Sequence, residues 1–424
     1  MDNANQSVQE LLLDYENFWI RRQVQILLAG FEFKLDKQRS FKMQKKLIAI
    51  AVAAVLAPAA AMADTSNVNV YGRLNVSLDS QTGVTGQTSG LAVNTNSSRF
   101  GVKGTEDLGD GYKAIFQVEA NVNLTGTGRG GNGNTVAIQG TTNTGAFGGQ
   151  IRDTWLGLAT PMGTLQAGRM PMENHWAYDA NLFADQIGDL LTFSCPAPCS
   201  GRSNGEILYT TPNMSGFTAN VQFYPTSSVN PAAAGVVGTP GPTAATSHSW
   251  GLEMNYAVLG VKLNFNYLSR NTGFNTEYRP IALSAIYEDS WGLVNAQYIR
   301  DKRNNAAYQQ AERTIFSLGG KYNVMPNGAI KATYSRANDV TGDAVAATAV
   351  NGLTINPNSG ANMFVFGFDY SLSKRTMVQL AYARTKNDGN ANYGINGGGH
   401  NNQIATPTNG DSPRAFGVNV AHNF

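Results

Sequence analysis

The feature that most constrains this chain is a two-residue alternation of polar and apolar side chains that recurs along most of its length. In residues 70–79 the polar side chains fall on one face and the apolar ones on the other, and residues 112–121 and 261–269 repeat the pattern. Period two with one polar face is typical of a β-strand. After Ala63 we find neither a sustained helical period nor a run of about 18 apolar residues. The sequence therefore predicts an all-β fold without transmembrane helices.

The connections between these segments are alternately short and long. Seven are tight and rich in Gly, Pro, Asn and Asp: 106–111, 160–163, 211–216, 258–260, 288–292, 324–328 and 371–375. Eight are long: about 80–96, 124–149, 171–201, 226–246, 271–277, 302–311, 339–359 and 388–410. Fifteen connections predict sixteen strands, each of about ten residues, which suits a tilted strand crossing a bilayer. An even strand number with short turns on one side predicts an antiparallel transmembrane β-barrel of the outer-membrane type.

The alternation also predicts which face of the sheet lines the water-filled lumen and which face contacts lipid. An arginine facing lipid at the bilayer midplane costs about 2–4 kcal/mol, so we assign the polar face to the lumen. Closure is required because each unpaired backbone group in hydrocarbon costs several kcal/mol. Strand 150–159 fits poorly, since Arg152 and Asp153 are adjacent and strict alternation requires them to face opposite ways.

The start of the chain has the pattern of a processing signal. Met43 precedes Lys45 and Lys46, an apolar run over 47–56, and a small-x-small site ending at Ala63. We predict a signal peptide over 43–63, cut after Ala63. The alternative, a membrane-spanning helix, is disfavoured because the apolar run is short and is broken at Pro58. Residues 1–42 are expected to be spurious, with Met43 as the true start, or else a cytosolic leader; the barrel is expected over 64–424.

Charge excludes one class of partner. Without residues 1–63 the chain has equal numbers of basic and acidic residues, so the net charge of +2 resides in the leader and signal. No net field favours nucleic acid, and any electrostatic function is expected to be local.

The segment 171–201 is the mid-chain loop expected to carry function. It is long, lies between two clear strands and contains many large apolar side chains, so it is expected to pack against the inner wall of the barrel. Its carboxylates are then expected to face arginines on that wall. These carboxylates are Glu173, Asp179, Asp185 and Asp189.

The same segment contains the two cysteines of the chain, Cys195 and Cys199. Export to an oxidising compartment favours a disulfide between them, with a pair of free thiols as the alternative. No metal site is expected, since the histidines are scattered. No cofactor is expected either: the G-x-G-x-x-G pattern at 126–131 is not followed by a helical pattern.

Several motifs resemble those of the trimeric Gram-negative porins, particularly the general-diffusion porins of β-proteobacteria. They are VYGRLN (70–75), SSRFGVKGTEDLGDGYKAIFQVE (97–119), TLQAGR (164–169), RSNGEILYTTPNMSGF (202–217), YSLSKRT (370–376) and the terminal AHNF. The resemblance spans the chain after Ala63. It implies a sixteen-stranded barrel, a homotrimer and a third loop folded inward to set the pore size.

Individual site residues follow from this resemblance. Arg99 of SSRFG, Arg152 of IRDTW and Arg202 of RSNGE match arginines that line the family's pore. Glu119 of FQVE matches a wall carboxylate, and Arg73 of YGR stands where a basic wall residue is common. The CPAPC stretch departs from the family pattern, so the acids of the third loop cannot be aligned individually.

Two interpretations of the arginines and the loop acids remain open. Together they can create a transverse field that sorts solutes by charge, or they can be structural ion pairs that hold the loop in place.

The expected function is that of an outer-membrane porin, a homotrimer in contact with outer-membrane lipid, that passes small hydrophilic solutes and ions without chemistry. The alternatives are a substrate-specific porin, a barrel-embedded hydrolase, and an adhesin or autotransporter translocator. The ion preference is not predicted.

Overall fold

The structure is a computed structural model of the whole chain, and it divides into two compact units, Met1–Ala61 and Met62–Phe424. It describes residues 67–87, 90–125, 151–171, 180–194, 202–225, 248–273, 276–305, 309–345, 348–350, 353–395 and 407–424. The predicted leader and signal peptide lie outside these residues. So do Glu173, Asp179, Cys195 and Cys199, for which the expectations of a constriction and a disulfide remain predictions.

The described part of the second unit is almost entirely strand. The strands of the main sheet are β1 (Asn67–Thr82), β2 (Gly90–Thr95), β3 (Arg99–Gly109), β4 (Tyr112–Asn121), β5 (Ile151–Thr160), β6 (Gly163–Pro171), β7 (Arg202–Thr210), β8 (Phe217–Tyr224), β9 (Ser249–Val258), β10 (Val261–Gly273), β11 (Thr276–Tyr278), β12 (Ile281–Asp289), β13 (Gly292–Asn304), β14 (Gln310–Met325), β15 (Gly328–Ala337), β16 (Thr341–Gly342), β19 (Ala361–Ser371), β20 (Thr376–Asn387) and β21 (Arg414–Asn423). A small hairpin, β17 (Ala349–Val350) and β18 (Leu353–Thr354), and the short helix α4 (Leu191–Ser194) complete the described elements.

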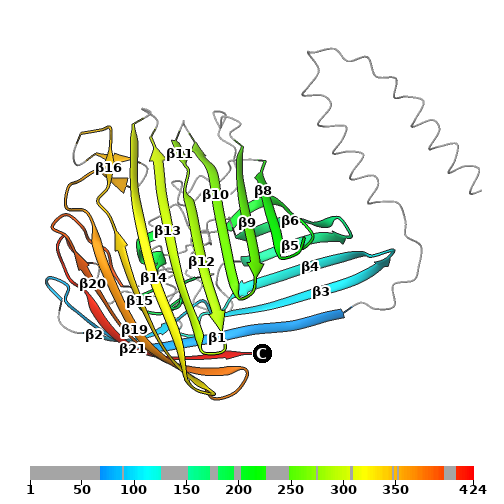
Figure 1. Cartoon of the computed structure of the whole chain (residues 1–424), viewed down its shortest axis with the longest axis horizontal. Coiled ribbons are helices and arrows are strands. Elements are labelled where there is room, and N and C mark those ends of the chain that lie inside the picture. Colours follow the sequence, from blue (N-terminus) through cyan, green and yellow to red (C-terminus); the bar gives the residue numbers. More distant parts are fainter. Residues whose placement is uncertain are drawn as a thin grey trace, which may run out of the picture. The chain divides into compact units, whose positions relative to one another are not determined.

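Strands that are adjacent in the barrel pair antiparallel, and the last strand, β21, pairs with the first, β1. The sheet therefore closes, as the two strands lying side by side in Figure 1 show. At three places, two consecutive strands lie end to end and together count as one strand of the barrel. β2 and β3 both pair with β1, β11 and β12 both pair with β13, and β15 and β16 both pair with β14. The result is a closed, sixteen-stranded antiparallel barrel, which confirms the predicted fold class.

Strands extend into two of the predicted long loops. β10 and β11 occupy most of 271–277, and β13 and β14 occupy half of 302–311. The polar composition of these stretches was interpreted as loop. However, the sheet continues there beyond its apolar band, and strands can have polar side chains on both faces once they leave the hydrocarbon.

The two faces of the sheet differ as the alternation predicts. On β1, Asn75, Ser77 and Asp79 are buried while Leu78 is exposed, and on β19 Phe364 and Phe366 are exposed. Exposed apolar side chains thus cover one face, which suits contact with lipid, and polar side chains cover the other. Among the described residues, no helix is long and apolar enough to cross a membrane.

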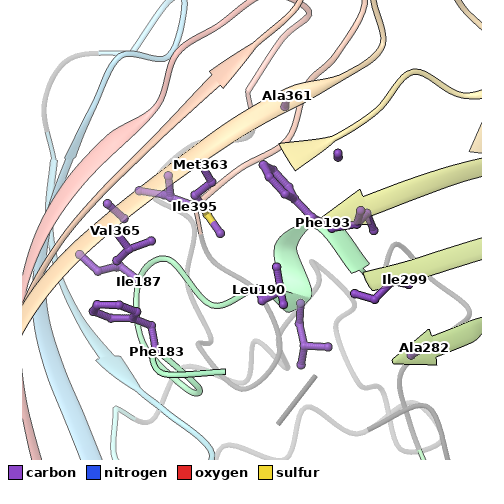
Figure 2. Close-up of a cluster of buried hydrophobic side chains, with 14 of the residues drawn as sticks. Phe183, Ile187, Leu190, Phe193, Ala282, Ile299, Ala361, Met363, Val365 and Ile395 are labelled. Atoms are coloured by element: carbon purple, nitrogen blue, oxygen red, sulfur yellow. The ribbon is translucent and has the colours of Figure 1, made fainter. Parts of the chain in front are cut away.

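The main buried apolar cluster is formed between residues 182–193 and the sheet. Figure 2 shows Phe183 and Ile187 beside Val365, and Phe193 of α4 near Ile395. The cluster also includes Leu268, Ile299 and Met363, which come from β10, β13 and β19. Residues 182–193 belong to the segment 171–201, which is the third long loop of the chain. The apolar side chains of this third loop therefore pack against the barrel strands, and this packing positions the carboxylates of the loop.

Candidate pore constriction

One ion pair joins the third loop to the first strand. The guanidinium Nη1 of Arg73 on β1 donates to the Asp185 Oδ2 carboxylate oxygen at 3.0 Å. The Arg73 side chain is 21% exposed and that of Asp185 is 5% exposed, so the pair is shielded on the loop side and reached by solvent on the strand side. A hydrogen bond to a charged group stabilises by about 1.5–3 kcal/mol in such a setting.

The backbone of the same loop is held by strands on other parts of the barrel. Asn295 of β13 donates its side-chain amide to the Ala180 carbonyl at 2.9 Å, and Lys331 of β15 donates to the Leu182 carbonyl at 2.9 Å. The Gly188 amide donates to the Ile395 carbonyl at 2.6 Å. The segment that begins at β6 and returns at β7 is therefore anchored on β1, β13 and β15 at once.

Lys331 links the loop to the wall in two further ways. Its ammonium lies 2.8 Å from Asp369 Oδ1 and 4.5 Å from the centre of the Phe183 ring. The carboxylate compensates the charge of this buried lysine, and the ring lies over it in a cation–π contact.

Asp189 has a different position from Asp185. Its carboxylate is completely buried and accepts hydrogen bonds from the backbone amides of Asp185 and Leu191 and from the Asn181 side chain. Burial raises the pKa of the Asp189 carboxyl to about 6. Asp189 thus organises the turn that presents Asp185, and within the described residues it has no arginine partner.

The predicted wall arginines lie close together at one part of the sheet. Arg73 and Arg99 are directly opposite each other on β1 and β3. Arg152 of β5 pairs with Glu119 of β4 at 2.5 Å and also donates to Asn121 at 3.1 Å. Arg99 makes no ion pair with any residue that the structure describes.

Glu119 is held by a second group that sequence reasoning missed. The Tyr71 hydroxyl donates to Glu119 Oε2 at 2.9 Å. The Tyr71 ring crosses Gly101, where an added Cβ would lie 2.4 Å from Cζ of the ring. A side chain at position 101 would displace the tyrosine, so the glycine lets the hydroxyl reach the carboxylate. Tyr71 has the same parity as Arg73 on β1, which places both on the polar face, but the partner of its hydroxyl could not be predicted from the sequence.

A β-bulge explains the adjacent charges on β5. Between Val118 and Ala120 the register of β4 against β5 shifts by one residue. Strict alternation, which predicted opposite faces for Arg152 and Asp153, therefore does not hold here, and that expectation is corrected. Arg152 pairs with Glu119, whereas Asp153 forms an ion pair with Arg202 of β7.

A second buried charge cluster lies on β13 and β14. Asp301 accepts from Arg303 at 2.8 Å and from Arg313 at 3.3 Å, and all three side chains are at most 1% exposed. Arg313 also donates to the Tyr393 hydroxyl at 2.6 Å, and the Tyr393 ring packs edge-on against Phe193 with 5.0 Å between centroids. This chain of contacts connects the barrel wall to the third loop through residues 391–395.

The described residues contain no group of three or more His, Cys, Asp or Glu side chains placed to hold a metal ion. The site that the structure does assemble is an array of paired charges between a loop and a barrel wall. Such an array can bind and orient passing charged solutes.

Comparison with known proteins agrees with this geometry. A family model described as "Gram-negative porin" matches residues 49–390. Among curated relatives, the major outer membrane protein P.IA of Neisseria meningitidis serogroup C is 27% identical over 412 residues, covering 83% of this chain and 96% of the relative. The major outer membrane protein P.IB of Neisseria sicca is 27% identical over 373 residues, covering 80% and 93%.

Solved structures share the fold. An anion-selective porin from Comamonas acidovorans superposes with a TM-score of 0.67 at 21% identity, covering 85% of this chain and 100% of that chain. The outer-membrane expressed OmpT of Vibrio cholerae superposes with a TM-score of 0.58 at 14% identity, covering 86% and 99%. Because the family model matches more than half of the sequence, the chain belongs to the Gram-negative porin family and is an outer-membrane protein.

Proposed function

We propose that the protein forms a water-filled channel for passive diffusion of small hydrophilic solutes and ions, and that the channel is narrowest between the third loop and the arginines of β1, β3, β5 and β7. The observation that carries the proposal is the Arg73–Asp185 ion pair, taken with the anchors at Asn295 and Lys331. A loop that leaves the barrel at β6 and contacts β1, β13 and β15 has to cross the lumen.

The pairing of the charges gives the wall arginines two different roles, one structural and one in contact with solutes. Arg73, Arg152 and Arg202 each have a carboxylate partner, so these three arginines fix the wall and the loop in place. Arg99 is the wall arginine left to act on solutes among the described residues. We infer that the transverse field at the constriction depends mainly on Arg99 and on the solvent-facing side of Arg73.

The proposed assembly is a homotrimer embedded in outer-membrane lipid. The resemblance to trimeric porins supports it, as does the wide band of exposed apolar side chains on the outer face. Mass measurement of the protein extracted in mild detergent tests the assembly, and a monomeric mass in several detergents would contradict it.

Planar bilayer recording tests the channel itself. The purified protein should give stable ohmic conductance steps, grouped in threes, and Arg99→Gln should move the reversal potential in a salt gradient toward cation preference, since it removes one fixed positive charge. Lys374→Gln, at the opposite end of the barrel in the β19–β20 turn, is the matched control and should leave the reversal potential unchanged. Absence of channels would refute the proposed function, and an unchanged reversal potential in Arg99→Gln would refute the role of Arg99.

A further inference from the structure

The buried charge cluster on β13 and β14 extends to two neighbouring strands and contains more arginines than carboxylates. Arg270 of β10, Tyr278 of β11 and Arg303 of β13 are register partners in one row on the inner face of the wall. Arg313 of β14 is the register partner of Asp301 of β13. Because register partners have Cβ atoms about 4.5–5.5 Å apart, the three arginines and the carboxylate are near neighbours at the loop ends of these strands. We call these five residues the arginine cluster.

The arginine cluster is shielded from water. Arg303 is 1% exposed, Arg313 2% and Arg270 6%. Ile299, one two-residue step further along β13, is completely buried and belongs to the same apolar cluster as Phe193 of α4 (Figure 2). A buried charge costs several kcal/mol unless an opposite charge lies beside it. The charges within the arginine cluster therefore need to be balanced nearby.

Two of the arginines share one carboxylate. Asp301 accepts hydrogen bonds from Arg303 at 2.8 Å and from Arg313 at 3.3 Å. Glu277 and Glu312 alternate to the opposite face of the sheet, where each pairs with another arginine. The stretches adjoining these strands that the structure does not describe, 226–247, 274–275 and 306–308, contain no Asp or Glu. Among the described residues the arginine cluster therefore has a net positive charge.

Two buried hydrogen-bond donors of the cluster also have no acceptor among the described residues. They are Nε of Arg313 and the hydroxyl of Tyr278. The other nitrogens of the Arg313 guanidinium are used, since Nη1 donates to the Tyr393 hydroxyl and Nη2 donates to Asp301. The Tyr278 hydroxyl lies within electrostatic range of all three guanidinium groups. A buried donor without an acceptor costs about 1–3 kcal/mol, so this position favours an acceptor that carries negative charge.

We propose that the arginine cluster binds a small inorganic oxyanion, phosphate or sulfate, that accepts hydrogen bonds from Nε of Arg313 and from the Tyr278 hydroxyl. Guanidinium groups match the spacing of oxyanion oxygens, and several donors from different strands suit an ion with several acceptor oxygens. Because the cluster is almost completely buried, it suits a free ion that stays bound rather than the phosphate group of a larger solute. The bound ion joins β11 and β14 and, through Tyr393 and Phe193, supports the third loop. The site lies on other strands than the proposed constriction and does not depend on the proposed channel.

Equilibrium dialysis of the detergent-purified protein against radiolabelled phosphate, at constant ionic strength in sodium chloride, tests the site. The wild type should bind one phosphate per chain with saturation. Arg313→Gln removes a charged donor and should weaken binding about tenfold or more. Arg300→Gln is the matched control, because it removes the same charge from the opposite face of β13, and it should leave phosphate binding unchanged.

Tyr278→Phe keeps the test available if Arg313→Gln fails to fold. It removes a hydroxyl that has no partner among the described residues, so without phosphate the variant should be at least as stable as the wild type in urea unfolding. Phosphate at constant ionic strength should raise the urea midpoint of the wild type and raise that of Tyr278→Phe less. Equal shifts in the two proteins would show that the hydroxyl does not contact the ion.

Competition experiments identify the occupant. Sulfate should displace labelled phosphate, whereas glucose 6-phosphate should compete about tenfold more weakly or worse, since its sugar does not fit a buried site. Equal competition by glucose 6-phosphate would overturn the proposal in favour of a solute-binding site. Absence of saturable phosphate binding, or equal binding by the wild type, Arg313→Gln and Tyr278→Phe, would also overturn it. Glu173→Gln/Asp179→Asn should leave phosphate binding unchanged, and a gain in phosphate affinity in that variant would show that an acid of the third loop occupies the site instead.

Discussion

Gly188 is the position where the docking of the third loop can be tested most directly. Its φ of +81° lies in the left-handed region, and its amide donates to the Ile395 carbonyl at 2.6 Å. A Cβ added at Gly188 would lie 2.5 Å from both Cγ atoms of Val365. Val365 is completely buried on β19 and its branched side chain cannot rotate away, so an alanine at 188 has to push the loop off the wall.

The cost of Gly188→Ala has two parts. Placing a non-glycine residue in the left-handed region costs about 1–2 kcal/mol. Separating Cβ from Val365 to an ordinary contact of 3.4 Å or more requires a shift of about 1 Å, and overpacking of this kind costs about 1–3 kcal/mol. We expect Gly188→Ala to lower the free energy of unfolding by about 2–5 kcal/mol and to change the unit conductance.

Val365→Ala provides the matched rescue because it removes both of the clashing methyl groups. Alone it should cost about 1–3 kcal/mol for the cavity it leaves. In Gly188→Ala/Val365→Ala most of the steric part disappears, because only the contact with Cβ of residue 365 at 3.1 Å remains. The double variant should therefore be about 1–3 kcal/mol more stable than the sum of the two single effects predicts. Urea unfolding in lipid vesicles measures the energies and planar bilayer recording measures the conductance. Strict additivity would show that the loop does not rest on β19 as described.

Three further predictions concern the loop and its anchors. Tyr393→Phe removes the hydroxyl that accepts a hydrogen bond from the buried Arg313, so it should lower the free energy of unfolding by about 1–3 kcal/mol in the same urea assay. Tyr370→Phe is the control, because the Tyr370 side chain has no described hydrogen bond, and it should change the free energy of unfolding little. Burial raises the pKa of Asp189 to about 6, so the docked loop binds more protons than the free loop between pH 4 and 6. Lowering the pH from 7 to 5 should therefore strengthen docking of the loop about tenfold, measured as slower protease cleavage within 171–201. A pH dependence of cleavage that persists in Asp189→Asn would contradict this prediction. Lys331→Met removes a hydrogen bond to the Leu182 carbonyl and leaves Asp369 without its closest cation, so it should destabilise the barrel by about 3–5 kcal/mol, whereas Lys331→Met/Asp369→Leu should recover most of this loss.

The sequence determined the architecture of the barrel because the relevant signal is local. Each strand shows its polar and apolar faces within ten residues, so the number of strands, the direction of Arg73 and Glu119, and the closure of the sheet follow without knowledge of any distant contact. The same local signal was wrong where it depended on unbroken alternation. The bulge at Arg152 and Asp153 and the long strands β13 and β14 depend on pairing with neighbouring strands, which composition does not reveal.

The tertiary structure decided how the third loop is held. The sequence predicted a loop on the inner wall with acids facing arginines, but it could not separate Asp185, which pairs with Arg73, from Asp189, which is buried among backbone amides. The anchors lie far apart in the chain: Asp185 contacts a strand 112 residues away, and Leu182 is bound by a lysine 149 residues away. A carboxylate has the same chemistry at either position, and only the folded barrel determines whether a cation or a set of amides surrounds it.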